Sequence, residues 1–162
     1  MNLLSAHGRP ISLSPVFSSP IRAGVRAGLI AAAATSGAII GFALRHNDWA
    51  GPFARLGSRV LQGFGVVGAP RFIPVAAGLA AHLSWMVVWG IVFATMSHRK
   101  TPAVSVVVAL CVGVAAMMLA RSIVPMAMGA ATFAALPGVQ VALCLALMAA
   151  GLVTGRAFSR AE

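Results

Sequence analysis

Residues 72–96 of the chain, FIPVAAGLAAHLSWMVVWGIVFATM, contain no Lys, Arg, Asp or Glu. An α-helix rises about 1.5 Å per residue, so roughly 20 apolar residues cross the ~30 Å hydrocarbon core of a bilayer. This stretch is long enough to cross with about a turn to spare. We therefore predict a transmembrane helix over residues 72–97 and interpret the rest of the chain around it.

The overall composition is also typical of an integral membrane protein. Of the 162 residues, 60% are hydrophobic and 9% are charged, and the mean hydropathy is +0.95. The 12 Lys and Arg residues far outnumber the two acids, Asp48 and Glu162. These cations border apolar runs, where they anchor helix ends at lipid phosphates, so we expect a lipid bilayer and no nucleic acid as the partner.

The two ends of the chain are predicted to be tails. Residues 1–20 carry three prolines among serines, which favours an extended or loosely ordered segment. They lack the cationic start, short apolar core and cleavage site of a signal peptide, so we expect the spans to direct insertion. Residues 21–156 then form a single membrane domain, followed by a short tail at 157–162.

The first span is predicted over residues 22–45, around an uncharged run at 27–44. Small residues recur in it at intervals of four, and a neighbouring stripe repeats the spacing. Such a smooth face lets another helix approach closely, although Ala and Gly are common in spans generally. The predicted helix-packing residues are Gly24, Gly28, Ala32, Ser36, Gly37 and Gly41.

An amphipathic helix is predicted over residues 52–64. Its apolar residues fall at helical spacing on one side, and Arg55, Ser58, Arg59 and Gln62 occupy the other. The segment is too short and too charged to span, so we expect it in the headgroup plane, with Arg55 and Arg59 facing lipid. A solvated loop is the alternative, because glycines are frequent here.

Two further spans are predicted, over residues 102–121 and 138–156. Prolines and glycines interrupt the apolar sequence between them, which indicates a turn with a short interfacial or partly re-entrant piece. Charge at mid-bilayer is costly, so we expect Arg121 at the interface, contacting lipid phosphate. The alternative is a functional partner for Arg121 in another subunit.

The predicted fold is therefore an all-α integral membrane protein, with four transmembrane helices in an antiparallel bundle and one short interfacial helix. Three or five spans are the alternative counts. With the amino terminus inside, seven Lys and Arg residues fall on the cytoplasmic side and five on the other. That difference favours both termini in the cytoplasm, and we expect a bacterial inner membrane.

The sequence favours a protein without catalytic activity. Hydrolysis, phosphoryl transfer and carboxylate-driven proton pumping need Asp or Glu at the reacting centre, and both acids lie outside the spans. The chain has no Tyr, no GxSxG, no HExxH and no glycine-rich phosphate loop with its Lys. We expect no metal site and infer no soluble substrate.

His82 is the one ionisable residue deep in a predicted span. An imidazole in hydrocarbon needs a partner, so we expect it to face inward. A hydroxyl or a backbone carbonyl on a neighbouring helix is the simplest partner. Ligation of a tetrapyrrole or metal is an alternative, in which Gly78 leaves room for a macrocycle and Trp85 and Trp89 line it. A proton relay is the third.

The segment GLAAHLSWMVVWG, residues 78–90, resembles the pigment-binding stretch of bacterial antenna polypeptides. There a small residue, then Ala-His, then downstream Trp residues surround a bacteriochlorophyll. The resemblance covers about a dozen residues and implies His82 as the ligand. The antenna polypeptides cross the membrane once, whereas four spans are predicted here.

Other ligand sets have less support. The remaining histidines lie at the ends of spans or in the tail, so a bis-His haem is excluded within the chain. Met117, Met118 or Met148 could complete a His/Met pair, although Met usually fills cores. Cys111 and Cys144 lie in different spans without CxxC spacing and are interpreted as small apolar residues.

Three functional hypotheses follow. The first is a non-catalytic accessory subunit of a larger membrane complex, bacterial and energy-transducing (respiratory or photosynthetic), which contributes helix packing and lipid or cofactor contacts to other membrane subunits. The second is a small homo-oligomeric transporter or channel, with the broken region before the last span lining a pathway. The third is a tetrapyrrole-binding membrane protein that uses His82.

Overall fold

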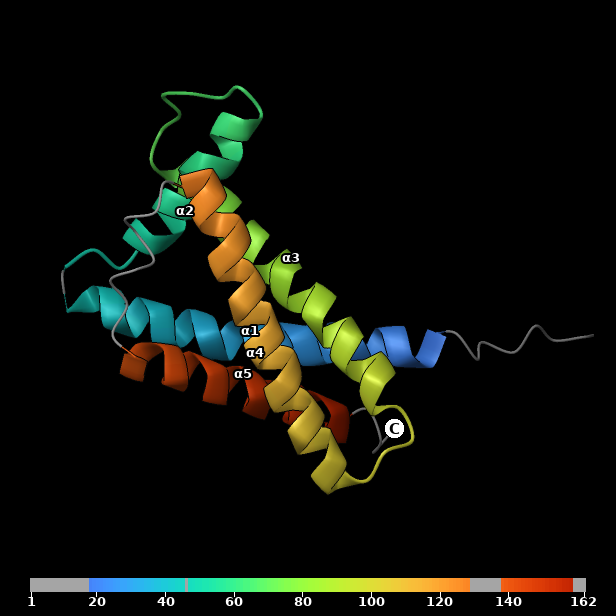
Figure 1. Cartoon of the computed structure of the whole chain (residues 1–162). Coiled ribbons are helices and arrows are strands. Elements are labelled where there is room, and N and C mark those ends of the chain that lie inside the picture. Colours follow the sequence, from blue (N-terminus) through green and yellow to red (C-terminus); the bar gives the residue numbers. More distant parts are fainter. Residues whose placement is uncertain (1–17, 46, 129–137, 159–162) are drawn as a thin grey trace, which may run out of the picture.

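The computed structural model describes residues 18–45, 47–128 and 138–158, and within these ranges it contains helices joined by turns and no strands. This confirms the predicted all-helical class. The described ranges hold five helices (Figure 1). They are α1 (Ser18–Leu44), α2 (Gly51–Gly63), α3 (Phe72–Ser97), α4 (Pro102–Met128) and α5 (Gly138–Phe158).

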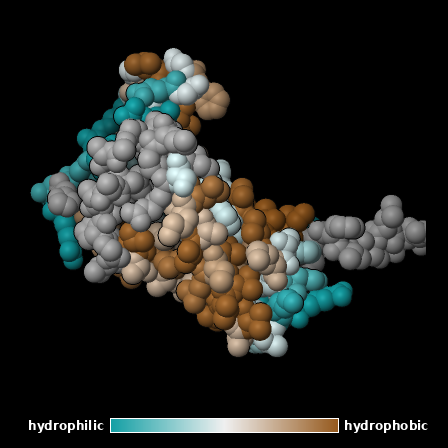
Figure 2. Space-filling view, in the orientation of Figure 1, coloured by the Kyte–Doolittle hydropathy of each residue, from teal (hydrophilic) through white to brown (hydrophobic). Residues whose placement is uncertain are grey.

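The chain is an integral membrane protein by the length and composition of its helices. Three segments are long and apolar enough to cross a bilayer: Pro20–Leu44, Phe72–Ser97 and Pro102–Ala120. Val141–Ala157 is a shorter apolar helix. Figure 2 shows apolar surface between two polar ends, one around α2 and the end of α1, the other at the α3–α4 turn. This distribution fits a bilayer whose hydrocarbon core surrounds the apolar surface and whose headgroups lie at the two polar ends.

The largest difference from the predicted boundaries is at α4. We predicted its end at Arg121 and an irregular segment after it, but the helix continues through Pro125 to Met128. The apolar span itself, Pro102–Ala120, agrees with the predicted span over 102–121, and the difference is that the residues directly after Arg121 are helical. The sequence after Arg121 stays apolar, and a proline is tolerated in a membrane helix because neighbouring groups can satisfy the freed carbonyl. The rest of the predicted irregular segment, 129–137, lies outside the described residues, as does most of the predicted N-terminal tail.

The helices alternate in direction around α1. Contacts between Gly24 and Ile91 near one end, and between Thr35 and His82 further along, make α3 antiparallel to α1. Contacts of Ala27 and Ala31 with Gly155 and Gly151 make α5 antiparallel to α1 as well. Helix α4 packs on α5 and α3, and α2 packs along the first half of α3 (Figure 1). The start of α1, the α3–α4 turn and the end of α5 therefore share one end of the molecule.

The turn between α1 and α2 follows from local sequence. At the end of α1, the amides of Asn47 and Asp48 donate to the carbonyls of Leu44 and Ala43, and Asn47 has a φ of 52°. This is a Schellman motif, whose left-handed position favours Asn or Gly. It ends α1 and places Asp48 beside the start of α2.

The core is built mainly from small side chains. Ala27, Ala31 and Ala32 on α1 are buried, together with larger residues such as Phe93 on α3 and Leu152 on α5. Alanine and glycine allow helix backbones to approach closely, which strengthens the dispersion contacts between them. In lipid these contacts matter because the hydrophobic effect does not drive helices together. Several larger apolar residues of α4, among them Val107 and Met118, are exposed and available to lipid.

Candidate functional site

The interface between α1 and α3 is closed by glycines from both helices. A Cβ atom built at Gly24 would lie 2.5 Å from the Cα of Ile91, and one at Gly28 would lie 2.5 Å from the carbonyl oxygen of Met86. Gly90 of α3 in turn contacts the backbone of Gly24 and Gly28. The two backbones therefore touch, and neither position accepts a side chain without moving a helix.

The same device joins α2 to α3 and α5 to α1. Gly57 of α2 and Gly78 of α3 lie against each other's helix backbone, close to Pro74 and Phe53. Gly151 and Gly155 of α5 pack against α1 at Ala31 and Ala27. Of these glycines, the sequence analysis had singled out Gly78, but as space for a macrocycle and not as a packing position.

The predicted small-residue face of α1 divides into two parts. Gly24, Gly28 and Ala32 are buried in the bundle. Gly37 and Gly41 are exposed, and a Cβ atom at either position would meet nothing within 4 Å. Ser36 stands between the two parts and is half-buried. The second half of α1 thus carries a glycine face that the described helices leave uncovered.

His82 has a partner inside the bundle. Its Nε2 atom lies 3.0 Å from the hydroxyl oxygen of Thr35 on α1, and Thr35 is 2% exposed. The Thr35 hydroxyl also lies 2.9 Å from the carbonyl oxygen of Ala31 and 3.2 Å from that of Ala32. These contacts connect the middle of α3 to the middle of α1 through one buried hydroxyl.

The contacts assign a direction to these hydrogen bonds. The Thr35 hydroxyl carries one proton, and the carbonyl oxygens of Ala31 and Ala32 can only accept. The hydroxyl therefore donates to the backbone of its own helix, and its oxygen accepts the Nε2 proton of a neutral His82. In hydrocarbon, this hydrogen bond satisfies one ring nitrogen of the imidazole without burying a charge.

Aromatic rings complete the surroundings of His82. The ring of Phe53 on α2 meets the imidazole edge-on, with centroids 6.0 Å apart. Trp85 and Trp89 pack against each other in the same manner, with centroids 5.8 Å apart. Since the backbone of α2 lies against Gly78, α2 occupies the space that a macrocycle would need beside that residue. The arrangement suits helix packing better than the pigment geometry that the resemblance implies.

Sequence reasoning missed two partners. Thr35 was one hydroxyl among several in the first span, and only its depth, similar to that of His82, could have indicated it. Asp48 was placed in a turn, yet it accepts a hydrogen bond from Arg71 and lies 3.7 Å from Arg55. Asp48 is the one acid in a segment with several arginines, and this pattern could have predicted the ion pairs.

The other candidate residues lie apart from His82. Arg59 is exposed on α2, and the side chain of Arg121 lies outside the described residues. Cys111 is exposed, Cys144 is half-buried, and Met148 is part of the core. In the described ranges, no three residues among His, Cys, Asp and Glu gather closely enough to hold a metal ion.

Comparisons with protein-family models, with curated proteins and with solved structures gave no match to this chain. Three features of the described residues bear on function. The helices of the bundle pack with their backbones in contact, the His82 imidazole has a hydrogen-bond partner within the chain, and Gly37 and Gly41 of α1 are not covered by another described helix.

Proposed function

We propose that this protein is a non-catalytic accessory subunit of a larger membrane protein complex. The observation that carries the proposal is the divided face of α1. Its first half is covered by helices of this chain, and Gly37 and Gly41 in its second half remain open. Membrane helices associate through small residues that permit close backbone approach, so this half of α1 suits a helix from another subunit.

The interior of the bundle also favours a structural role. Helices α1, α2, α3 and α5 meet through glycine or alanine at backbone contact. Helix backbones that touch in this way leave little room for a solute to pass between them. The alternative of a homo-oligomeric transporter relied on a broken region from Pro125 to Pro137. Helix α4 continues through Pro125 to Met128, and residues 129–137 lie outside the described residues.

The partnered state of His82 weakens the case for cofactor chemistry. Its Nε2 atom, one of two possible ligand atoms, is engaged by Thr35 within the chain. A visible absorption spectrum of the purified protein separates the hypotheses. The proposal expects no Soret or near-infrared band, and a band lost in the His82→Ala variant would support the tetrapyrrole hypothesis instead.

We further propose four spans, with α5 as the shortest, and both termini in the cytoplasm of a bacterial cell. The alternating directions of α1, α3, α4 and α5 support this topology. Cations at the end that holds the start of α1 support the orientation by the positive-inside rule. Those described at this end are Arg22, Arg26, Arg99, Lys100 and Arg156.

Extraction in a mild detergent followed by mass spectrometry of co-purified proteins tests the proposed function. An accessory subunit co-purifies with defined partners at constant stoichiometry. Recovery of this chain alone, or only as a homo-oligomer, would contradict the proposal.

A matched pair of variants sharpens this test. Gly37→Leu places a large side chain on the open face and is expected to release the partners while the chain still folds, because nothing lies within 4 Å. Val107→Phe makes a comparable change at an exposed position of α4 and is expected to leave the complex intact. Equal retention of partners by both variants would show that the open face of α1 does not bind them.

A further inference from the structure

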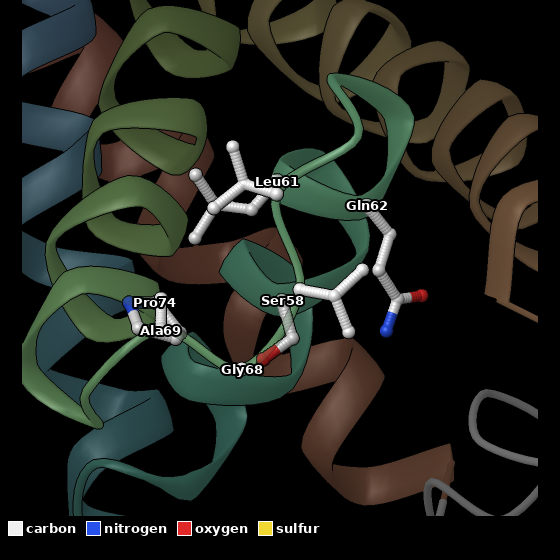
Figure 3. A pocket seen from close by; sticks show the side chains of 8 residues that line it. Ser58, Leu61, Gln62, Gly68, Ala69 and Pro74 are labelled. Carbon is white, nitrogen blue, oxygen red and sulfur yellow. The ribbon is translucent and has the colours of Figure 1, made fainter.

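A groove lies where α2 turns back toward α3, at one polar end of the molecule (Figure 3). Its volume is about 200 Å³, which is room for several water-sized groups. Figure 3 shows Ser58, Leu61 and Gln62 projecting from α2 beside the segment that leads into α3. The lining residues are Ser58, Leu61, Gln62, Val66, Val67, Gly68, Ala69 and Pro74.

The backbone that forms this groove is fixed by local structure. Helix α2 ends in a second Schellman motif, in which the amides of Gly65 and Val66 donate to the carbonyls of Gln62 and Leu61. Gly65 has a φ of 77° and Gly68 a φ of 75°, a region that favours glycine. The contact of Gly57 with α3 holds the helix itself in place, so the groove is a built feature of the fold.

The surroundings of the groove indicate immersion in lipid. Large apolar side chains next to it are exposed: Phe64 and Val67 are each 81% exposed, and Phe72 is 71% exposed. Trp49, before α2, is 57% exposed. Aromatic residues at the end of a span are typical of the membrane–water interface, where phospholipid headgroups lie. The groove is therefore at headgroup depth.

The charge beside the groove favours an anion. Arg55, Ser58, Arg59 and Gln62 follow one another at helical spacing and share one face of α2. Asp48 pairs with Arg55 and Arg71. Arg59 has no ion-pair partner among the described residues, and the side chains of Ser58 and Gln62 make no hydrogen bond to them. Ser58 and Gln62 thus offer two neutral hydrogen-bonding groups in the lining of the groove, and Arg59, which follows Ser58 on α2, is exposed next to that lining.

We propose that this groove binds the headgroup of an anionic glycerophospholipid. Arg59 contacts the phosphate, Ser58 and Gln62 hydrogen-bond to headgroup or ester oxygens, and Val66 and Val67 border the acyl chains. This inference deepens the general lipid contact expected for Arg55 and Arg59 into a defined site. It does not depend on the proposed accessory function.

Native mass spectrometry of the full chain in detergent, titrated with phosphatidylglycerol or phosphatidylcholine, tests the proposal. Phosphatidylglycerol is expected to bind more tightly. Arg59→Gln is expected to weaken phosphatidylglycerol binding roughly fivefold, which corresponds to the binding free energy that one cation contributes near anionic lipid. Ser58→Phe fills the groove without changing charge and is expected to weaken binding of both lipids.

Arg22→Gln is the matched control, because it removes the same charge from an exposed position at the opposite end of the molecule. It is expected to leave binding within twofold of wild type. Equal affinity for the two lipids, equal losses in the Arg59 and Arg22 variants, or unchanged binding in Ser58→Phe would each overturn the proposal. Circular dichroism of each variant confirms that helix content is retained, and Ser58→Ala serves if Ser58→Phe does not fold.

Discussion

At the scale of single residues, a polar contact between His82 and Thr35 joins two helices inside the described part of the bundle. The 3.0 Å contact joins two helices in surroundings where an unsatisfied imidazole would be costly. Because Thr35 already donates to its own backbone, the hydroxyl connects the α3 side chain to the α1 main chain. The interaction therefore fixes the position of α3 relative to α1 as well as satisfying a polar group.

A double-mutant cycle measures this connection. Thr35→Val keeps the side-chain shape and leaves His82 without its acceptor, while His82→Leu removes the donor. We expect a coupling free energy of about 0.6–1.7 kcal/mol between the two sites, the range seen for hydrogen bonds between membrane helices. Unfolding by steric trapping in bicelles provides the free energies. Strictly additive effects would show that the two side chains do not interact.

Asp48 gives a second prediction at this scale. Asp48→Asn removes two ion pairs but keeps the shape of the turn, and both arginine partners are well exposed. We expect a loss of about 0.2–1 kcal/mol in unfolding free energy at low salt, because exposed ion pairs are weak. The difference should vanish in 1 M salt, where screening is strong. A loss that persists in 1 M salt would mean that Asp48 acts through uncharged contacts.

At the scale of helices, glycine determines which faces meet. Within α1, Gly28 touches the backbone of α3 and Gly37 touches nothing within 4 Å, although both were predicted as helix-packing residues, each in one of two neighbouring stripes of small residues. The pattern therefore identifies faces that can pack closely. It does not identify the partner of each face.

Identical substitutions at these two positions test the distinction. Gly28→Ala puts a Cβ atom 2.5 Å from the Met86 carbonyl oxygen, so the helices must separate, and we expect a loss of about 1–3 kcal/mol. Gly37→Ala has open space and is expected to be neutral or to stabilise by up to about 1 kcal/mol, because alanine is the better helix former. Equal thermal stability of the two variants in detergent would contradict the observed α1–α3 interface.

The difference between Gly28 and Gly37 also shows how far the sequence could predict this protein. The positions of α2 and α3 agree with prediction to within one residue, because glycines, prolines and charges punctuate strongly apolar runs. The partner of His82 lies 47 residues away and depends on where α1 crosses α3, which local patterns do not encode. For the same reason the macrocycle space expected at Gly78 is taken by α2.

At the scale of the whole molecule, alternating helices place the start of α1 and the end of α5 together. Ala27 of α1 contacts Gly155 of α5, and Arg156 donates a hydrogen bond to the Lys100 carbonyl in the α3–α4 turn. Five described Lys and Arg residues lie at this end, and Arg45, Arg55, Arg59 and Arg71 lie at the opposite end, where Asp48 pairs with two of them. The asymmetry is the basis for the proposed orientation.

Reporter fusions test this topology. We expect a cytoplasmic reporter such as green fluorescent protein to fluoresce at either terminus in bacterial cells, and alkaline phosphatase to be inactive at both. A phosphatase inserted in the connection after Gly63 should be active, since α2 lies at the other end of the molecule. Opposite results at the two termini would require an odd number of spans.

The most direct test of the central claim is site-specific photo-crosslinking in native membranes. A photoreactive amino acid replaces Gly41, on the open face of α1, and in a second variant replaces Val107, on the exposed face of α4. We predict that Gly41 yields one or a few defined adducts with other membrane polypeptides, and that Val107 yields mainly lipid adducts. Adducts of Gly41 with lipid alone, or only with a second copy of this chain, would contradict the claim that the protein is an accessory subunit.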